Sequence, residues 1–352
     1  MNREQSTEYR VQRKKILIVR LDRIGDVLLS TPVVKAVRDA YPDSQIAFMV
    51  RPYARDIVEG NPYLNEVIIY DKAGSEKGLI GNLRFILALK KKNFDLALVL
   101  HPTTRTHLVT FLAGIPERVG YDRKWGFLLT KRIPHTKHLG LRHEIDYTLD
   151  LLQYVGVRAQ EKKLLMPVRP ESEKKVGGIF NRYGVKESDI VITVNPSASC
   201  VSKRWSAERF AKVCDALAKD RGARIIIISG AEDKSFGDRV AGSMRERSIN
   251  LSGQTSVSDV ASILKKSRLF ISNDSGPVHI ACAVGTSVIA IFGRSDRGLS
   301  PLRWGPTGGR DTVLHKDAGC DTCLAHNCDK GFKCLMAITV EDVLAAAEKI
   351  LG

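Results

Sequence analysis

Short apolar runs alternate with longer amphipathic stretches along most of this chain. The short runs are rich in Ile, Val and Leu, which is typical of strands buried on both faces of a parallel sheet. Such strands are predicted at 15–20, 46–50, 67–70, 96–100, 190–194, 224–229, 269–272 and 287–292. Helices are predicted at 27–40, 79–91, 144–154, 207–219, 234–246, 257–265 and 340–351.

Alternating strands and helices predict parallel βαβ units, here in two successive sets. The segment 156–170 separates them and contains two prolines and a cluster of charges, as expected of a linker. We expect an α/β protein with two Rossmann-like, doubly wound domains, at 1–165 and 166–338, and a C-terminal helix at 339–352. Ligands of such sheets bind at the carboxyl ends of the strands, so the cleft between the domains is the expected site.

A polar turn, Asp-Ser-Gly-Pro-Val-His at 274–279, follows the last strand but one. Pro277 stands near the first position of the helix expected there. Unpaired backbone N–H groups of a helix N-terminus, with the Ser275 hydroxyl beside them, suit a phosphate group. Asp274 and Ser275 could instead cap the helix, and His279 could be a core histidine.

Two further strand ends in the second half carry polar side chains. The loop after 190–194 contains small hydroxyl residues and the Lys203-Arg204 pair, which suit a phosphate, although a solvated loop would look similar. Glu232 and Asp233 follow 224–229, where a carboxylate can bind ribose hydroxyls. Asp233 could equally cap a helix.

The first strand ends in Leu-Asp-Arg-Ile-Gly-Asp, residues 21–26. Gly25 permits a tight turn, and Asp26 stands at the start of a helix that faces the expected cleft. A single carboxylate in that position fits a general base. Helix capping explains Asp26 equally well.

The chain has 352 residues and a formal net charge of +16. Residues 1–170 contain 29 Lys and Arg against 18 Asp and Glu, so the first half is the part expected to meet an anionic partner. Nucleic acid, an anionic membrane surface and a phosphorylated substrate all fit this charge. The polar N-terminus is unlike a signal peptide, so we expect a cytoplasmic protein with mainly reduced cysteines.

Several common enzyme motifs are absent from the sequence. No G-x-G-x-x-G follows the first strand, and there is no G-x-x-x-x-G-K-[ST], G-x-S-x-G or H-E-x-x-H. The sequence also lacks D-x-D, a common means of holding a divalent metal against a diphosphate. A nucleotide diphosphate would therefore be neutralised by helix N-termini and cationic side chains, and no cofactor is required.

Two motifs, Ile-Leu-Ile-Val-Arg-Leu-Asp-Arg-Ile-Gly-Asp-Val-Leu-Leu-Ser-Thr-Pro at 16–32 and Ser-Asn-Asp-Ser-Gly-Pro-Val-His-Ile-Ala at 272–281, occur in this order. They resemble those of glycosyltransferase family 9, the ADP-heptose:lipopolysaccharide heptosyltransferases, and the resemblance spans nearly the whole chain. It implies a GT-B fold and inverting, metal-independent transfer of heptose to a lipopolysaccharide inner-core acceptor. The first domain would bind the acceptor and the second the nucleotide sugar.

The resemblance also implies roles for individual residues. Asp26 would be the general base, Lys203 would stabilise the leaving ADP and Glu232 would bind ribose. The remaining donor-binding residues would be Ser199, Asp274, Ser275, Gly276 and His279.

The acceptor side is defined by residues at other strand ends of the first half. Arg51, His101 and Arg105 would face the cleft and meet phosphate or sugar carboxylates, although ordinary surface arginines fit as well. A lipid-linked anionic acceptor and transient contact with the inner leaflet of the membrane would agree with the basic charge.

Four cysteines lie close together in the loop 318–335. Cys320, Cys323, Cys328 and Cys334 could bind a structural zinc ion, and the opening C-x-x-C favours this. The later spacing is unlike a common zinc knuckle, so free thiols or labile disulfides are the alternative.

The sequence is also compatible with other functions. A GT-B enzyme with another nucleotide sugar and a sugar-nucleotide epimerase would share the same site. A basic nucleic-acid-binding protein is the non-enzymatic alternative, but the sequence has no helix-turn-helix or stacking-aromatic signature. We therefore expect no nucleic-acid partner.

Overall fold

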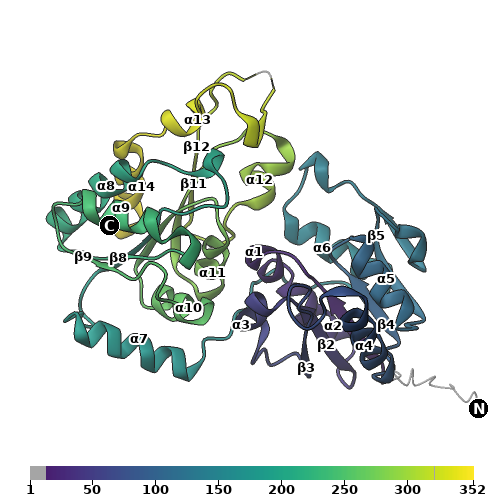
Figure 1. The fold of residues 1–352 in the computed structure, drawn as a ribbon. Coiled ribbons are helices and arrows are strands. Elements are labelled where there is room, and N and C mark those ends of the chain that lie inside the picture. Colours follow the sequence, from purple (N-terminus) through teal and green to yellow (C-terminus); the bar gives the residue numbers. More distant parts are fainter. Residues whose placement is uncertain (1–12, 321) are drawn as a thin grey trace, which may run out of the picture.

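The computed structural model describes residues 13–320 and 322–352, and its strands form two six-stranded parallel sheets (Figure 1). The first sheet has the order β3-β2-β1-β4-β5-β6. Its strands are β1 (Lys15–Val19), β2 (Gln45–Val50), β3 (Glu66–Ile69), β4 (Leu96–Val99), β5 (Glu117–Asp122) and β6 (Lys131–Pro134). The second has the order β12-β11-β10-β7-β8-β9. Its strands are β7 (Val191–Asn195), β8 (Arg224–Ile227), β9 (Ser248–Asn250), β10 (Leu269–Asn273), β11 (Ser287–Phe292) and β12 (Thr312–His315).

Helices connect the strands within each half and pack on the sheets. Those of the first half are α1 (Ile24–Leu28), α2 (Thr31–Ala40), α3 (Arg55–Val58), α4 (Gly78–Lys91), α5 (Thr104–Leu112) and α6 (Glu144–Gln153). Those of the second half are α7 (Pro170–Arg182), α8 (Ala207–Arg221), α9 (Lys234–Ser243), α10 (Val257–Lys265), α11 (Gly276–Val284), α12 (Pro301–Trp304), α13 (Lys333–Met336) and α14 (Val340–Leu351). None of these helices has the combination of length and apolar character that crossing a bilayer requires.

Both sheets have the same doubly wound strand order. In each half the first three strands are added toward one edge of the sheet, and the next three are added toward the other edge, starting beside the first strand. This change of direction falls between β1 and β4 in the first sheet and between β7 and β10 in the second. Loops at the carboxyl ends of these central strands therefore leave an opening in which a ligand can bind. The four central strands are buried, and Ile16 to Val19 of β1 have no exposed surface.

The predicted strands and helices are found, with boundaries that differ by a few residues. The helix predicted over 27–40 is wrong as one element, because α1 ends at Leu28 and α2 begins at Thr31. Pro32 explains the break, since proline has no N–H to donate and its ring clashes with the carbonyl four residues earlier. The strands β5, β6, β9 and β12 and the helices α3, α5, α7, α12 and α13 were not predicted.

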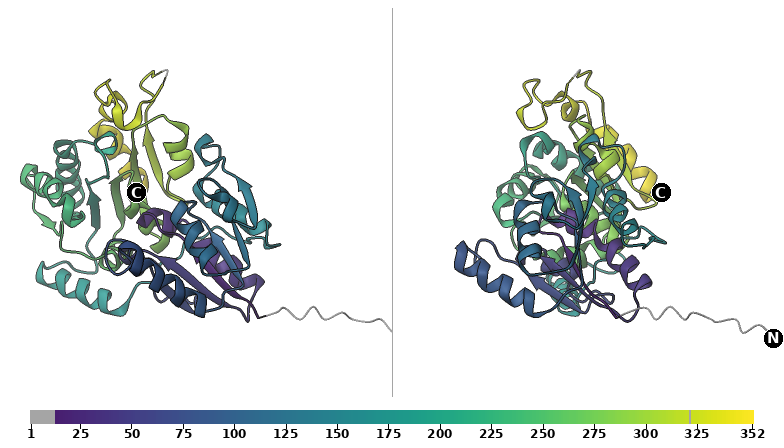
Figure 2. Two further views of the ribbon diagram at one scale, coloured as in Figure 1. Left: turned by 45° about the vertical axis from the view of Figure 1, so that its right-hand side comes forward. Right: turned by 90° about the vertical axis from the view of Figure 1, so that its right-hand side faces the viewer.

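The two halves face each other and are in contact (Figure 2). Helix α1 of the first half lies against α11 of the second. Residues 154–169 form no helix or strand and connect the halves, and at their end Arg169 binds Asp56 (Nη2 to Oδ1, 2.9 Å) and Ser258 (Nε to Oγ, 3.2 Å). Residues that follow β1, β7 and β10 line the space between the two halves.

Candidate functional site

The first wall of the site is the turn between β1 and α1. Asp26 is the third residue of α1, and its Oδ1 accepts a hydrogen bond from Arg20 Nη2 at 2.7 Å. Arg20 also donates through Nε to Asp22 Oδ1 at 2.8 Å. The N-cap of α1 is Arg23, so capping does not account for Asp26. Its carboxylate instead lines the interdomain cleft.

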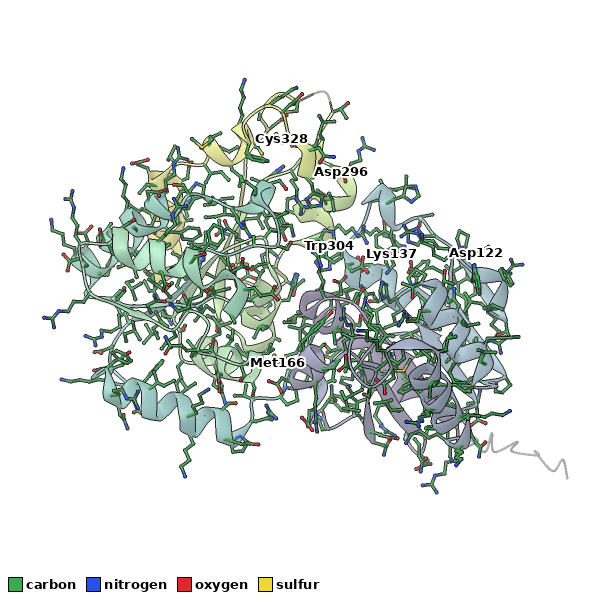
Figure 3. The ribbon with its side chains drawn as sticks, in the orientation of Figure 1. Asp122, Lys137, Met166, Asp296, Trp304 and Cys328 are labelled. Carbon is green, nitrogen blue, oxygen red and sulfur yellow. The ribbon has the colours of Figure 1, made fainter. Side chains whose placement is uncertain are left out.

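Behind Asp26 lies a buried cluster of charges around Glu144, whose side chain is 1% exposed. Glu144 Oε1 accepts from Lys137 Nζ at 2.6 Å and from Arg20 Nη2 at 3.2 Å. Glu144 Oε2 accepts from Arg303 of the second half, through Nη2 at 2.8 Å and Nε at 3.0 Å. Arg20, Lys137, Glu144 and Arg303 are called the Glu144 cluster below. Lys137 lies on the first-half side of the interdomain space, opposite Trp304 (Figure 3).

The cluster places Asp26 in an unusual electrostatic environment. Burial, reinforced by the neighbouring Asp22, raises the pKa of Asp26 to about 6 against the opposing effect of Arg20. Burial alone would also raise the pKa of Glu144, but Lys137, Arg20 and Arg303 together lower it to about 2. Burial lowers the pKa of Lys137 to about 8. Asp26, unlike Glu144, therefore has a pKa close to neutral pH, and burial raises the pKa of the neighbouring Asp22 as well.

The second wall is the turn between β10 and α11. Asp274 Oδ2 accepts from Arg294 Nη2 at 2.7 Å and lies 2.9 Å from Lys203 Nζ. Ser275 Oγ accepts from Asn195 Nδ2 at 2.9 Å and lies 3.0 Å from Ser272 Oγ. Ser275 is the N-cap residue of α11, but its side chain makes no capping hydrogen bond. Pro277 has no N–H, and the Val278 N–H donates to the Ser275 backbone oxygen at 3.1 Å, so the first turn of α11 leaves the Gly276 N–H for a ligand.

The walls touch where α1 meets α11. A Cβ atom placed on Gly25 would lie 2.9 Å from His279 Cδ2, and one on Gly276 would lie 3.3 Å from Ile24 Cγ2. His279 is buried, and this burial lowers its pKa to about 3, so the imidazole is neutral at physiological pH. Its Nδ1 has no hydrogen-bond partner among the described residues. Both glycines permit an approach that any side chain would obstruct.

Two adjoining cavities occupy the cleft. The first, of about 530 Å³, contains most of the predicted residues: Asp26, Ser199, Lys203, Asp274, Ser275, Gly276 and His279. The second, of about 630 Å³, is lined by the carboxylates of Glu232 and Asp233, by residues 255–257 and by the apolar side chains of Ile228, Val260 and Ile280. Ser199 and Ser275 line both. The two cavities thus meet at these hydroxyl groups.

The predicted acceptor residues lie farther out. His101, Arg51 and Arg105 do not line either cavity. Arg51 Nη1 donates to Tyr53 OH at 3.3 Å, and Tyr53 lines the first cavity. Arg105 binds Tyr70 OH at 3.2 Å. Their role in acceptor binding stays a prediction.

The sequence model of glycosyltransferase family 9 (heptosyltransferase) matches residues 82–333. The chain belongs to that family. It is accordingly a glycosyltransferase, which decides against the nucleic-acid-binding alternative.

Relatives of the family 9 enzyme extend over nearly its full length. Lipopolysaccharide heptosyltransferase 3 of Escherichia coli (strain K12) is 29% identical over 338 residues, which cover 93% of this chain and 95% of the relative. The crystal structure of a family 9 glycosyl transferase from Veillonella parvula is 26% identical and superposes with a TM-score of 0.86, covering 96% and 97% of the two chains. The E. coli ADP-heptose lps heptosyltransferase II structure is 21% identical, with a TM-score of 0.78 and coverage of 96% and 98%. The two sheets are therefore the halves of a GT-B fold.

The cysteine-rich loop of the family 9 enzyme, residues 318–335, reaches the first cavity. Its four cysteines line a small cavity of about 30 Å³, and the seven cysteines of the chain form no disulfide. Within 13–320 and 322–352 no group of three or more His, Cys, Asp or Glu side chains is arranged to hold a metal ion. His326 of the loop lines the first cavity (Cys328, close by in sequence, is labelled in Figure 3). Structural zinc and free thiols both stay predictions, which metal analysis of the purified protein separates.

The sequence analysis missed five charged residues of the site: Arg20, Lys137, Glu144, Arg294 and Arg303. Arg20 follows β1 directly and Arg294 stands two residues after β11, so the strand-end rule that identified Asp26 could have found them. Arg294 has a left-handed backbone (φ 57°) and its side chain is 4% exposed, a strained and buried position. Glu144 and Arg303 gave no such signal. Glu144 begins a helix, where an acidic residue is ordinary.

Replacing Gly25 by Ala is expected to destabilise the contact between the two halves, because the added Cβ would lie 2.9 Å from His279 Cδ2, closer than side-chain packing allows. The variant should unfold at a lower temperature than the wild type in a calorimetric melt. Gly178→Ala is the matched control, since its Cβ would meet nothing within 4 Å. Equal melting temperatures of Gly25→Ala and Gly178→Ala would contradict the close contact of α1 with α11.

Proposed function

We propose that this enzyme transfers a heptose from ADP-heptose to a lipopolysaccharide inner-core acceptor with inversion. The supporting observation is the opposition, within one cavity of about 530 Å³, of the Asp26 carboxylate and a wall that contains Lys203, Arg294 and the N-terminus of α11. The names of the E. coli relatives support the choice of donor and acceptor.

The donor would occupy both cavities. Its nucleoside would lie in the second cavity, where Glu232 can accept hydrogen bonds from ribose hydroxyls. The diphosphate would cross the junction at Ser199 and Ser275 and reach the N-terminus of α11, whose dipole favours negative charge. The heptose would then lie in the first cavity beside His279 and Asp274.

The reaction follows from the charges on the two walls. Asp26 removes the proton of the acceptor hydroxyl, whose oxygen attacks the anomeric carbon. The bond from that carbon to the diphosphate oxygen breaks, and ADP leaves with the electron pair. Attack from the side opposite the leaving group inverts the anomeric configuration. Lys203 and the α11 N-terminus stabilise the developing negative charge, and Arg294 adds a second cation near Asp274. These groups supply the positive charge, so the proposed reaction needs no metal.

The acceptor would approach over the first half. Arg51, His101 and Arg105 would bind its anionic groups, and the basic balance of residues 1–170 suits a phosphorylated sugar. A lipid-linked acceptor would bring the enzyme to the inner leaflet as a peripheral protein. The division of the chain at 165/166 into acceptor and donor domains belongs to the same proposal.

A donor panel tests the reaction. Purified enzyme should transfer heptose from ADP-heptose to a core-truncated acceptor, seen as the mass increase of the product and the release of ADP. ADP-glucose, UDP-hexoses and GDP-hexoses should give at least tenfold lower rates. Efficient transfer from one of these would establish a different donor, and interconversion of a nucleotide sugar without acceptor would establish an epimerase.

Asp26→Ala is expected to lower the rate of transfer by roughly 10²–10⁴-fold, the usual contribution of a general base. ADP binding, measured by calorimetry, should change little because Asp26 belongs to the opposite wall. Asp22→Asn is the informative comparison, since Asp22 also binds Arg20. Loss of ADP binding with retained transfer, or a greater loss in Asp22→Asn than in Asp26→Ala, would refute this assignment.

The pH dependence of kcat/KM should report the Asp26 carboxyl. Because the base must be ionised, the rate should fall as the pH drops below about 6, the raised pKa of Asp26. Replacing Arg303 by Met removes a cation from Glu144, so Arg20 is drawn toward Glu144 and the pKa of Asp26 rises further. The acidic limb should shift to higher pH, and Arg303→Lys should partly restore it. An unmoved limb would show that Arg303 has no influence on the base.

A further inference from the structure

Helix α4 exposes a strip of apolar side chains to solvent. Leu79 is 90% exposed, Ile80 71%, Leu83 57% and Leu87 50%. Single exposed leucines are normal on protein surfaces, but a contiguous apolar strip marks an interaction site. Only Ile86 and Leu89 of this helix are buried in the first half, so α4 is apolar on both its inner and its outer side.

The four exposed side chains form one face of the helix. Leu79, Leu83 and Leu87 follow each other at four-residue intervals, which places them along one side of an α-helix, and Ile80 widens this side. These four residues are called the α4 strip. Figure 1 shows α4 within the first half, and in the right-hand view of Figure 2 it lies at the outer margin of the molecule.

Positive charge accompanies the α4 strip. Between residues 78 and 92 there are four Lys or Arg residues and no Asp or Glu. Arg84, Lys90 and Lys91 are exposed, whereas Lys92 pairs with Glu66. At about 100° per residue, Arg84 and Lys91 flank the strip and Lys90 lies within it near the C-terminal end. An apolar face bordered by cations is typical of helices that lie in the interface of an anionic bilayer.

The start of α4 is tied to the edge of the sheet where the acceptor is expected. Tyr70 OH donates to Asn82 Oδ1 of α4 at 2.5 Å and accepts from Arg105 Nη1 at 3.2 Å. Asn82 Nδ2 in turn donates to the backbone oxygens of Gly78 and Glu76. The N-terminal part of the α4 strip is thus connected through Tyr70 to Arg105, one of the predicted acceptor residues.

We propose that the α4 strip docks on the surface of a membrane rich in anionic lipid. Leu79, Ile80 and Leu83 insert among the acyl chains near the headgroups, and Arg84, Lys90 and Lys91 bind lipid phosphates. A second copy of the chain fits this surface less well, because the same cations would repel each other. The proposal rests on the proposed function in one respect, that the acceptor is lipid-linked.

Vesicle sedimentation with the full chain tests the docking. Wild-type protein should pellet with vesicles of phosphatidylcholine and phosphatidylglycerol, much less with phosphatidylcholine alone, and less as salt increases. The triple variant Leu79→Gln/Ile80→Gln/Leu83→Gln should bind at least tenfold more weakly. Arg84→Gln/Lys90→Gln/Lys91→Gln should lose the preference for phosphatidylglycerol.

The matched control replaces exposed apolar residues elsewhere. Tyr183→Gln/Met336→Gln removes side chains that are 44% and 57% exposed in the second half, and should bind vesicles as the wild type does. Equal vesicle binding by the triple variant and the wild type would overturn the proposal. So would a wild-type dimer that the triple variant abolishes, because the partner would then be a second copy.

Activity assays distinguish this proposal from the proposed function. The triple variant should transfer heptose to a delipidated acceptor at the wild-type rate, and at least tenfold more slowly to the same acceptor embedded in vesicles. Equal loss on both acceptors would overturn the docking role. If no heptose is transferred by the wild type but vesicle binding depends on the α4 strip, the proposed function fails and the docking surface stands.

Discussion

The buried carboxylate of Glu144 links the two halves of the molecule. An ionised side chain that is 1% exposed is stable only when its oxygens are paired. Lys137 and Arg20 pair one oxygen from the same half, and Arg303 pairs the other from the opposite half. Opening the cleft would leave a buried charge incompletely compensated. Because Arg20 also binds Asp26, closure of the halves and the ionisation of Asp26 are physically linked.

Because the two sheets have the same strand order, functional groups of different kinds from the two halves meet in the cleft. Each half directs the end of its first strand into the cleft, as the doubly wound topology requires. In the first half this end carries Asp26, and in the second half Asn195 and the adjacent β10 end orient Ser275. The Asp26 carboxylate and the wall that contains Lys203 and Arg294 thus face each other without either half containing both. The two walls meet where Gly25 lies against the ring of His279, so close that a Cβ atom on Gly25 would be 2.9 Å from His279 Cδ2.

Much of the fold could be predicted because its central strands are long apolar runs bounded by polar turns. Strands β6, β9 and β12 lie at or near sheet edges, are three or four residues long and contain polar residues, so periodicity does not identify them. The helix break at Leu29–Ser30 was predictable from Pro32 but was hidden by the continuous apolar pattern. The α4 strip illustrates the opposite failure, since an amphipathic pattern does not tell which apolar residues a helix leaves exposed.

The sequence by itself determined which polar residues line the interdomain cavity, because a strand end followed by a polar turn is a local pattern. Asp26 and the 274–279 turn were identified from a glycine turn after a strand, and Lys203 from the polar loop after the strand predicted at 190–194. Only the tertiary structure decided how these residues act. Arg303 and Glu144 are 159 positions apart, and Asn195 and Ser275 are 80 apart. Whether a carboxylate caps a helix, binds a cation or exchanges a proton near pH 6 depends on such distant partners and on burial. Distant partners and burial arise only when the chain folds. Local sequence therefore specifies neither which side chains lose contact with water nor which charges then surround them.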